Sequence, residues 1–279
     1  MAKKINLPYF DHVLKKFSEK DSELSEAFSK NIHWGYWENP HKNKVTAKEY
    51  ADAQEALVEQ LVKLAEPSNE SVIADIACGF GGTIDFLNKN SANKTIVGLN
   101  IDIRQLVHAK NHINPDNRNN IFYVTGDAVK LPFASASVDI LFTVEAIFHF
   151  SDREAYFKEV NRVLKPEGQF IISDFISAEN FKLGKYLIWK NQRASYFGDF
   201  DLRYTISKYK KISAKTGFEV SHIMDVTKNT LPTFTYLNAA GKEMTGNNLF
   251  SRFQIKFLEY ISMKNLLKYY FLKFKKTTS

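Results

Sequence analysis

The segment VIADIACGFGGT, residues 72–83, has residue types and a spacing that could bind a nucleotide. Its apolar start predicts a buried strand, and the acid Asp75 falls where that strand should end. The small residues Ala77, Gly79 and Gly81 follow, and glycine lets a ligand lie against bare main chain. An apolar pattern at helical spacing resumes after the glycines. A strand, a glycine turn and a helix N-terminus together predict a nucleotide-sized cradle.

The glycine pattern disfavours two common kinds of nucleotide site. A phosphate-binding loop for ATP or GTP requires a lysine directly after the glycines, and this sequence has none there. The dinucleotide fingerprint requires a glycine three residues after Gly81, where the sequence has Ile84. The remaining alternative to a nucleotide cradle is a glycine turn that only packs a helix against a sheet.

Alternating strands and helices must position this cradle. Amphipathic helical patterns cover residues 46–65 and 152–164. Five strand-like runs lie at residues 72–74, 95–100, 121–124, 138–143 and 169–174. Two further runs, at 218–220 and near 231–237, complete a sheet of seven mostly parallel strands with helices on both faces. The predicted fold class is therefore α/β.

Three other parts flank or interrupt the predicted core, which spans residues 67–238. Residues 1–66 predict an N-terminal helical lid, with a first helix at residues 9–31. Aromatic residues without a clear strand pattern at 178–202 predict an inserted helical cap. Residues 239–279 predict a basic C-terminal helical tail.

Two segments allow two interpretations each. The aromatic cluster His33–Trp37 forms either a lid over a flat ligand or a hydrophobic clamp that holds the N-terminal helix to the core. In residues 252–279, apolar residues alternate loosely with lysines, which is typical of a basic amphipathic helix on anionic lipid. The same pattern fits a helix that packs on the cap with its lysines in water. We favour the packed helix, because lysine stems commonly cover apolar surface.

Composition and charge exclude several classes of protein. With 279 residues, 44% of them hydrophobic and 25% charged, the chain has the composition of an ordinary globular protein. A single cysteine, Cys78, and a start without a signal-peptide core predict a cytoplasmic location, and no run approaches the ~20 apolar residues of a membrane span. From Arg252 onward, seven bases and one acid account for +6 of the net charge of +7. The rest is nearly neutral, which predicts no nucleic-acid partner.

Several motifs follow one another in a recognisable order. After the glycine loop come Asn100, Gly126–Ala128, Glu145 and Arg162–Gly168. In this order they resemble the class I S-adenosylmethionine (SAM) methyltransferases, over roughly residues 70–230. More narrowly, the motifs HWGYW and E-A-I-F-H-F resemble the branch that acts on small molecules. That branch includes natural-product O-methyltransferases, tocopherol and sterol C-methyltransferases, and cyclopropane fatty acid synthases.

The resemblance implies a Rossmann-like core that binds SAM at its strand ends. Asp75 would lie near the amino-acid end of SAM, and the main chain of the glycine loop, where Ala77 replaces the family's usual first glycine, would cradle it. A polar set after the second strand would hold the ribose, and the residues after the third strand would contact the adenine. The implied cofactor-binding residues are Tyr36, Asp75, Ala77, Gly79, Gly81, Asn100, Ile101, Gln105, Asp127, Ala128 and Glu145. We expect no metal site.

His149 is the candidate general base. It follows the fourth strand, at the rim where an acceptor must sit, and its ordinary pKa of about 6.5 suits removal of a hydroxyl proton. Similar O-methyltransferases pair this histidine with an acid after the fifth strand, a position that Asp174 matches. The alternative is a histidine that packs against, or caps, the helix at 152–164.

We therefore expect a SAM-dependent methyltransferase that modifies a hydroxyl group of a hydrophobic or flat small molecule, because aromatic residues fill the predicted roof. The alternatives are C-methylation of a lipid, sterol or quinone-like acceptor, N-methylation of an amine, and a SAM-binding protein without activity. The sequence leaves the acceptor and the oligomeric state open.

Overall fold

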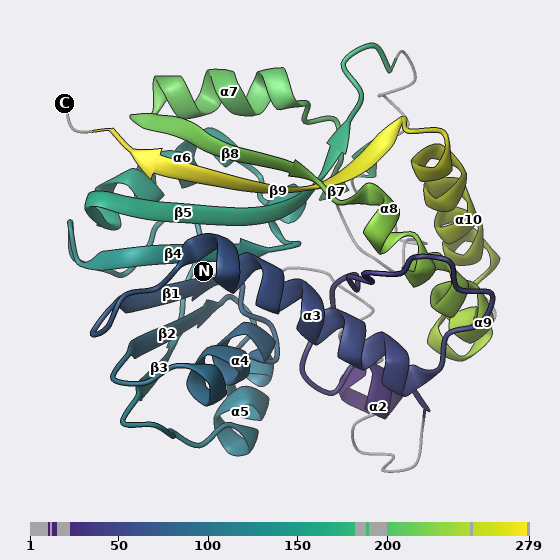
Figure 1. The fold of residues 1–279 in the computed structure, drawn as a ribbon, viewed down its shortest axis with the longest axis horizontal. Helices are drawn as coiled ribbons and strands as arrows, with labels where there is room; N and C mark the ends of the chain where they lie inside the picture. Colours follow the sequence, from purple (N-terminus) through teal and green to yellow (C-terminus); the bar gives the residue numbers. More distant parts are fainter. Residues whose placement is uncertain are drawn as a thin grey trace.

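The fold is built around one seven-stranded sheet flanked by helices (Figure 1). The structure, a computed structural model, describes residues 11, 13–15, 23–181, 188–189, 200–245 and 248–277. The strands of this sheet are β1 Val72–Ile76, β2 Thr95–Asn100, β3 Asn120–Thr125, β4 Val138–Val144, β5 Leu164–Ser177, β8 Phe218–Asp225 and β9 Leu267–Lys276. Their order across the sheet is β3-β2-β1-β4-β5-β9-β8, which confirms the predicted α/β class.

The sheet is parallel from β3 to β5 and antiparallel around β9. In β1, Ala74 pairs in parallel with Val97 of β2 on one side and with Leu141 of β4 on the other. β9 runs antiparallel to both of its neighbours, β5 and β8. The strand order reverses between β1 and β4, and open α/β sheets bind ligands in the crevice at such a switch point. The fold therefore places the end of β1 and the glycine loop at the expected binding edge.

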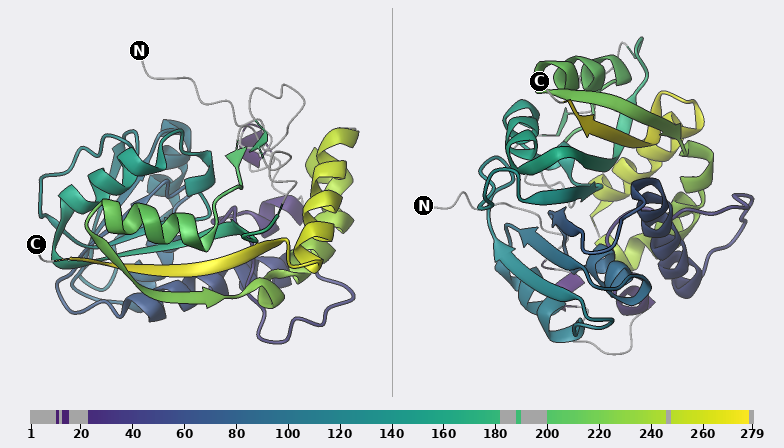
Figure 2. Two further views of the ribbon diagram at one scale, coloured as in Figure 1. Left: turned by 90° about the horizontal axis from the view of Figure 1, so that it is seen from above. Right: turned by 60° about the vertical axis from the view of Figure 1, so that its left-hand side comes forward.

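Helices cover both faces of the sheet and enclose two hydrophobic cores. The first face carries α3 (Ala47–Ala65), α4 (Gly82–Asn90) and α5 (Ile103–His112), and the second carries α6 (Arg153–Val163) and α7 (Ile206–Lys215) (Figure 2). Successive strand residues alternate between the cores: Ile140 and Phe142 of β4 join the first core, and Leu141 joins the second. The two-residue period of a strand explains why these runs are apolar at every position.

Local signals set the helix starts. The helix predicted at 46–65 is α3, and Thr46 and Glu49 form a capping box in which each side chain accepts a hydrogen bond from the other's N–H. The fully buried Leu57 and Leu61 pack this helix on the sheet. Asp102 and Asp152 likewise accept hydrogen bonds from the first turns of α5 and α6. The helices predicted at 46–65 and 152–164 are confirmed as α3 and α6.

The C-terminal part differs from the prediction. Residues 231–237 hold no strand: Leu231 is a turn residue between α8 (Thr227–Thr230) and α9 (Pro232–Thr245), and the rest begin α9. Within the predicted basic tail, the described residues form the end of α9, then α10 (Leu249–Met263), and then β9, which supplies the seventh strand between β5 and β8. The sheet therefore extends beyond the predicted core boundary at residue 238. Apolar residues in the β9 segment fit both a helical and a strand spacing, and burial between two strands selects the strand.

The lid and the cap fall partly outside the described residues. Within the predicted helix at 9–31, the structure gives α2 (Glu23–Ala27). Within the predicted cap, β6 (Ile188–Trp189) pairs with β7 (Phe200–Asp201) in an antiparallel ribbon, so this described part is a strand pair and not a helix. Residues 182–187 and 190–199 lie outside the described residues. In the described parts of the chain, no helix is both long and apolar enough to cross a membrane.

Candidate active site

The predicted binding residues lie at the carboxyl ends of neighbouring strands. Asp75 is in β1, Asn100 ends β2, and Glu145 directly follows β4. The Cys78 N–H donates to the Leu99 carbonyl at 3.1 Å, so the glycine loop lies against the end of β2. Because these strands are parallel, their ends meet at one edge of the sheet. The fold thus brings together residues that are distant in sequence.

The glycine loop has the backbone conformation that its sequence suggests. Gly79 and Gly81 have φ angles of 56° and 87°, in the left-handed region that favours glycine. Ala77, at the position where a glycine is usual in the resembling family, is also left-handed, with φ of 61°. A Cβ atom on Gly79 would meet only the Gln105 Oε1 atom, at 3.9 Å. The main chain around Gly79 is therefore open to a ligand.

Two amides after β2 form a buried polar pair with an unused donor. The Asn100 Nδ2 atom donates to the Gln105 Oε1 atom at 2.8 Å, and both side chains are buried. The Gln105 Nε2 group has no hydrogen-bond partner. An unsatisfied buried donor is costly, and a ligand hydroxyl group would satisfy it. This geometry fits the ribose contact expected of Asn100 and Gln105.

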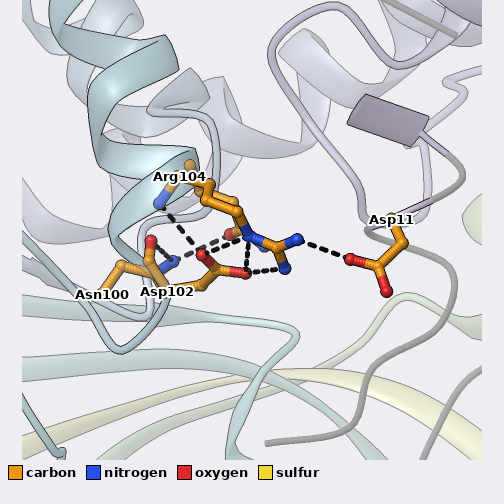
Figure 3. A network of polar contacts seen from close by, with 5 residues as sticks. Asp11, Asn100, Asp102 and Arg104 are labelled. Atoms are coloured by element: carbon orange, nitrogen blue, oxygen red, sulfur yellow. Dashed lines mark hydrogen bonds and ion pairs between the residues drawn. The ribbon is translucent and has the colours of Figure 1, made fainter. Parts of the chain in front are cut away.

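The next residues tie this loop to the lid. Asp102 accepts hydrogen bonds from both the main chain and the guanidinium group of Arg104, and the guanidinium also donates to Asp11 of the N-terminal part at 2.7 Å (Figure 3). The half-buried Ile101 lies between Asn100 and this ion-pair cluster. A lid segment and the loop after β2 are thereby joined through one arginine.

Asp75 is a buried acid without a cationic partner in the described structure. Burial raises the pKa of Asp75 to about 7, and a hydrogen bond from Thr83 offsets part of the rise. A ligand ammonium group beside this carboxyl group would favour its ionised form. After β3, the exposed Asp127 accepts a hydrogen bond from the Val129 N–H, and the buried Ala128 lies beside it.

Glu145 joins the lid, the end of β4 and the C-terminal strand. Its Oε2 atom accepts hydrogen bonds from the Trp34 N–H at 2.8 Å and from the Tyr269 hydroxyl group at 2.6 Å. Its backbone is left-handed, with φ of 48°, and the Glu145 N–H donates to Ser173 of β5. Burial raises the pKa of Glu145 to about 8, which favours a neutral carboxyl group in this position. The contacts support the interpretation of Glu145 as a residue that organises the site.

The aromatic cluster His33–Trp37 is a clamp in this structure. The rings of Trp34 and Trp37 are buried, and Trp34 stacks on Tyr269 at 5.6 Å. The His33 carbonyl accepts hydrogen bonds from Tyr50 and Gln54 of α3. Burial lowers the pKa of His33 to about 4, so this histidine is neutral at pH 7. The cluster fastens the lid to α3 and β9.

Tyr36 is not brought to the strand ends with the other predicted residues. Its N–H donates to the Ala53 carbonyl of α3 at 2.8 Å, and its ring lies 6.4 Å from that of Phe271 in β9. It also lines a cavity of about 290 Å³ between the lid and α3, with Trp37, Glu38 and Asp52. Tyr36 thus packs the first face of the sheet, whereas its neighbour Trp34 makes the contact with Glu145.

Asp174 does not form the predicted pair with His149. Its Oδ2 atom accepts hydrogen bonds from Arg153, at 2.9 Å, and from the hydroxyl group of Tyr209, and its Oδ1 atom has no hydrogen-bond partner. Asp174 is fully buried, and its carboxyl group is already held by Arg153 and Tyr209. Burial raises the pKa of Asp174, and the positive charge of Arg153 offsets part of the rise. Asp174, which lies within β5, is a structural partner of α6 and α7.

His149 lies on a short 3-10 helix, η1 (Ile147–His149), directly beyond β4. Its imidazole ring is half-buried and packs against Phe148, with the ring of Phe200 from the cap at 6.5 Å. Phe148 in turn contacts Phe175 at the end of β5. The histidine is therefore part of an aromatic wall at the same edge of the sheet as Glu145.

Three residues that contribute to this site and its supports are not singled out by the sequence. Trp34 stands in a recognised cluster, but nothing in its spacing indicates that its main chain meets Glu145. Tyr269 lies in the segment that the sequence predicts as a helical tail, so its position in strand β9 was not predicted. Arg153 occupies the first turn of an amphipathic helix, where an arginine is usually exposed. Within the described ranges, no group of three or more His, Cys, Asp or Glu residues could hold a metal ion.

Comparison with known proteins agrees with this geometry. Residues 74–172 match the family model of the methyltransferase domain. The chain is 25% identical over 232 residues to the methyltransferase GfsG of Streptomyces halstedii, covering 80% of this chain and 79% of that protein. It is 26% identical over 218 residues to an O-methyltransferase of Pyrenophora dematioidea, covering 77% and 78%.

A solved structure shares the fold over the whole chain. Geranyl diphosphate C-methyltransferase from Streptomyces coelicolor A3(2), in complex with Mg²⁺, geranyl diphosphate and S-adenosyl-L-homocysteine, superposes with a TM-score of 0.69. The match covers 99% of this chain and 100% of that chain, at 14% sequence identity. The domain match and the relatives support a class I SAM-dependent methyltransferase, and the solved structure shares its fold. The residues fit that cofactor, because the open main chain at Gly79 and the unused Gln105 donor lie together.

Proposed function

We propose that this enzyme methylates a hydroxyl group of a hydrophobic or flat small molecule, with His149 as the general base. The observation that carries the proposal is the position of His149. It lies just beyond β4 in an aromatic wall with Phe148 and Phe200, at the edge where the cofactor residues gather. Similarity to an O-methyltransferase over 77% of the chain supports the same reaction type.

The residues at the strand ends have separate tasks in this proposal. Asp75 would hold the ammonium group of SAM, the Asn100–Gln105 pair the ribose hydroxyl groups, and Asp127 with Ala128 the adenine. Bound SAM supplies a methyl group that its sulfonium charge already activates. The chain must then orient an acceptor oxygen and take up its proton, because positioning alone supplies much of the rate in such transfers.

His149 would accept the hydroxyl proton as the oxygen attacks. A neutral imidazole is suited to this role near pH 7. The aromatic wall would exclude water and bind the flat or apolar body of the acceptor. Asp174 takes no part in proton transfer in this proposal, because its carboxyl group is buried against Arg153 and Tyr209.

The test combines acceptor screening with a histidine substitution. Purified protein and methyl-labelled SAM would be incubated with phenols, alcohols, quinols and prenyl lipids, and the methylated atom located by NMR. We expect an O-methyl product, and His149→Ala should lower kcat by about 10²- to 10⁴-fold and flatten the acidic limb of the pH–rate profile. His112→Ala, on the exposed end of α5, is the matched control and should retain activity.

Two outcomes would overturn parts of the proposal. A C-methyl product would show that the geranyl diphosphate enzyme is the better functional guide, and that His149 removes a proton from carbon or none at all. Full kcat for His149→Ala at neutral pH, with unchanged SAM affinity, would mean that the enzyme works by positioning alone.

A further inference from the structure

Helix α10 exposes large apolar side chains along one face. Leu249 and Met263 are 74% and 64% exposed, and Phe253 and Tyr260 are exposed to nearly the same degree. The opposite face of the helix is buried against the rest of the protein, with Ile255 among its anchors. Surface apolar residues scattered singly need no explanation, but a row along one helix face marks an interaction site.

Cations share this face with the apolar side chains. Arg252, Lys256 and Lys264 are exposed, and at 100° per residue they fall, with the four apolar residues, within an arc of about 120°. Glu259 is the only acid in the α10 sequence and lies outside this arc. Its carboxylate accepts a hydrogen bond from Asn238 of α9 at 2.9 Å. The face, defined by these seven residues and called the α10 face below, is apolar and positively charged.

We propose that the α10 face binds the surface of an anionic lipid membrane. A helix that lies in the membrane plane typically carries apolar side chains that enter the acyl boundary and basic residues that meet the headgroups. Here the two kinds of residue share one face that is about 22 Å long, the length of 15 helical residues. Each lysine or arginine near an anionic surface adds attraction that salt weakens.

Two other occupants fit this face less well. In a two-fold interface with a second copy, the three cations of each chain would face those of its partner, and like charges in close contact disfavour association. A nucleic acid would satisfy the cations but would leave four apolar side chains against its polar backbone. An anionic lipid surface matches both parts of the face at once.

The surrounding structure keeps the helix in place for this contact. α10 packs on α9 through its buried side, and the chain passes from its C-terminus at Met263 into β9 within four residues. Because β9 is an inner strand of the sheet, the α10 face is fixed relative to the enzyme core (Figure 1). Helix α10 thus packs on α9, whereas the sequence pattern predicts packing on the cap, and its exposed face is available to lipid. This inference goes beyond the proposed function and does not depend on it.

Vesicle binding by the full-length protein tests the proposal. Flotation would be measured with vesicles of phosphatidylcholine alone and with equal parts of phosphatidylglycerol, at low and high salt. We expect binding only to the anionic vesicles, weakened by salt. Lys256→Glu/Lys264→Glu should weaken it by at least about 25-fold, at about fivefold per cation lost. The control Lys210→Glu/Lys211→Glu changes the net charge equally on the exposed side of α7 and should leave binding within about twofold of wild type.

A second pair of variants tests the apolar part. Phe253→Ser/Tyr260→Ser keeps the charge of the α10 face and should also weaken vesicle binding by about tenfold or more, since the apolar contribution is lost. Substitutions at exposed sites rarely affect folding, and circular dichroism would verify this. Failure of the wild type to bind anionic vesicles at low salt would overturn the proposal. Unchanged vesicle binding by Phe253→Ser/Tyr260→Ser would also overturn it. A third contrary result would be a wild type that binds no vesicles but self-associates in light scattering, with the α10 variants abolishing that self-association.

Discussion

The buried ion pair between Arg153 and Asp174 should be strongly coupled, and its removal offers a direct test of how α6, β5 and the cap are joined. The two side chains are almost completely buried, and Arg153 Nη1 lies 2.9 Å from Asp174 Oδ2. Arg153 also donates to the Asp201 carbonyl of β7 at 2.6 Å, and its guanidinium carbon lies 3.8 Å from the ring centre of Tyr204. One side chain therefore links three segments.

The magnitude follows from the burial of both charges. Removing one partner of a buried ion pair leaves the other charge without compensation, which costs about 3–5 kcal/mol of the free energy of unfolding. Arg153→Met and Asp174→Asn should each have this effect. Independent effects would add to about 6–10 kcal/mol. The double variant holds neither charge, and the introduced asparagine amide would still accept the Tyr209 hydrogen bond, so we expect it to cost less than about 5 kcal/mol.

A double-mutant cycle measured by urea unfolding checks this expectation. All four proteins would be unfolded at pH 7.5 (about the physiological value), with intrinsic fluorescence and circular dichroism as independent probes of a single transition. We expect a coupling energy of at least about 1 kcal/mol. Single-variant costs that add within about 0.5 kcal/mol in the double variant would refute the reasoning, because contacting buried charges cannot act independently.

Two other predictions concern the binding edge. Burial raises the pKa of Glu145 to about 8, so the native state binds this proton more tightly than the unfolded state, and the stability that the neutral form provides is lost as pH rises through about 8. Glu145→Gln keeps an oxygen that can accept hydrogen bonds from Trp34 and Tyr269, but it does not titrate. Between about pH 6 and about pH 9, urea unfolding should show that this variant loses less stability than the wild type, by on the order of 2 kcal/mol. Equal losses in the two proteins would contradict the raised pKa of Glu145. The second prediction concerns left-handed positions in the glycine loop. Ala77→Gly removes the steric cost of an alanine at a φ of 61°, but the glycine also makes the unfolded chain more flexible. The net effect should be a stabilisation of between zero and about 1 kcal/mol in the free energy of unfolding. Gly79→Ala, at φ of 56° and with open space for the Cβ atom, should destabilise by about 1–2 kcal/mol through conformation alone. Thermal unfolding of the pair measures both signs, and a stabilising Gly79→Ala would contradict the backbone interpretation.

Local patterns determined the elements that form the cradle. The apolar run of β1, the glycines after it and the cap residues Thr46, Asp102 and Asp152 each carry a signal within a few neighbouring residues. Such signals act through backbone sterics and short hydrogen bonds, so they do not depend on distant parts of the chain. The parallel order of the strands then follows from the helices between them.

The C-terminal strand of the sheet, β9, could not be predicted in this way. The segment LKYYFLKFKK has apolar residues at both helical and strand spacings, so its periodicity selects neither. Its partners, β5 and β8, decide the matter, because they satisfy its main-chain hydrogen bonds on both sides. Residues 231–237 are the opposite case, a predicted strand that is a helix. Proline is favoured in the first turn of a helix, so a segment with Pro232 near its start can begin a helix as readily as a strand.

The residues of the site show the same contrast between local patterns and long-range contacts. The sequence by itself determined that an acid, a glycine loop and the polar residues Asn100 and Gln105 would follow successive strands, because motif spacing and strand ends are local properties. Only the tertiary structure decided which charges meet. In the fold, Asp174 contacts Arg153 and Tyr209 and not His149. Glu145 accepts hydrogen bonds from Trp34 and Tyr269, which are 111 and 124 residues away along the chain. Hydrogen bonds and buried charges depend on distances of a few ångströms between remote segments, and only packing fixes those distances.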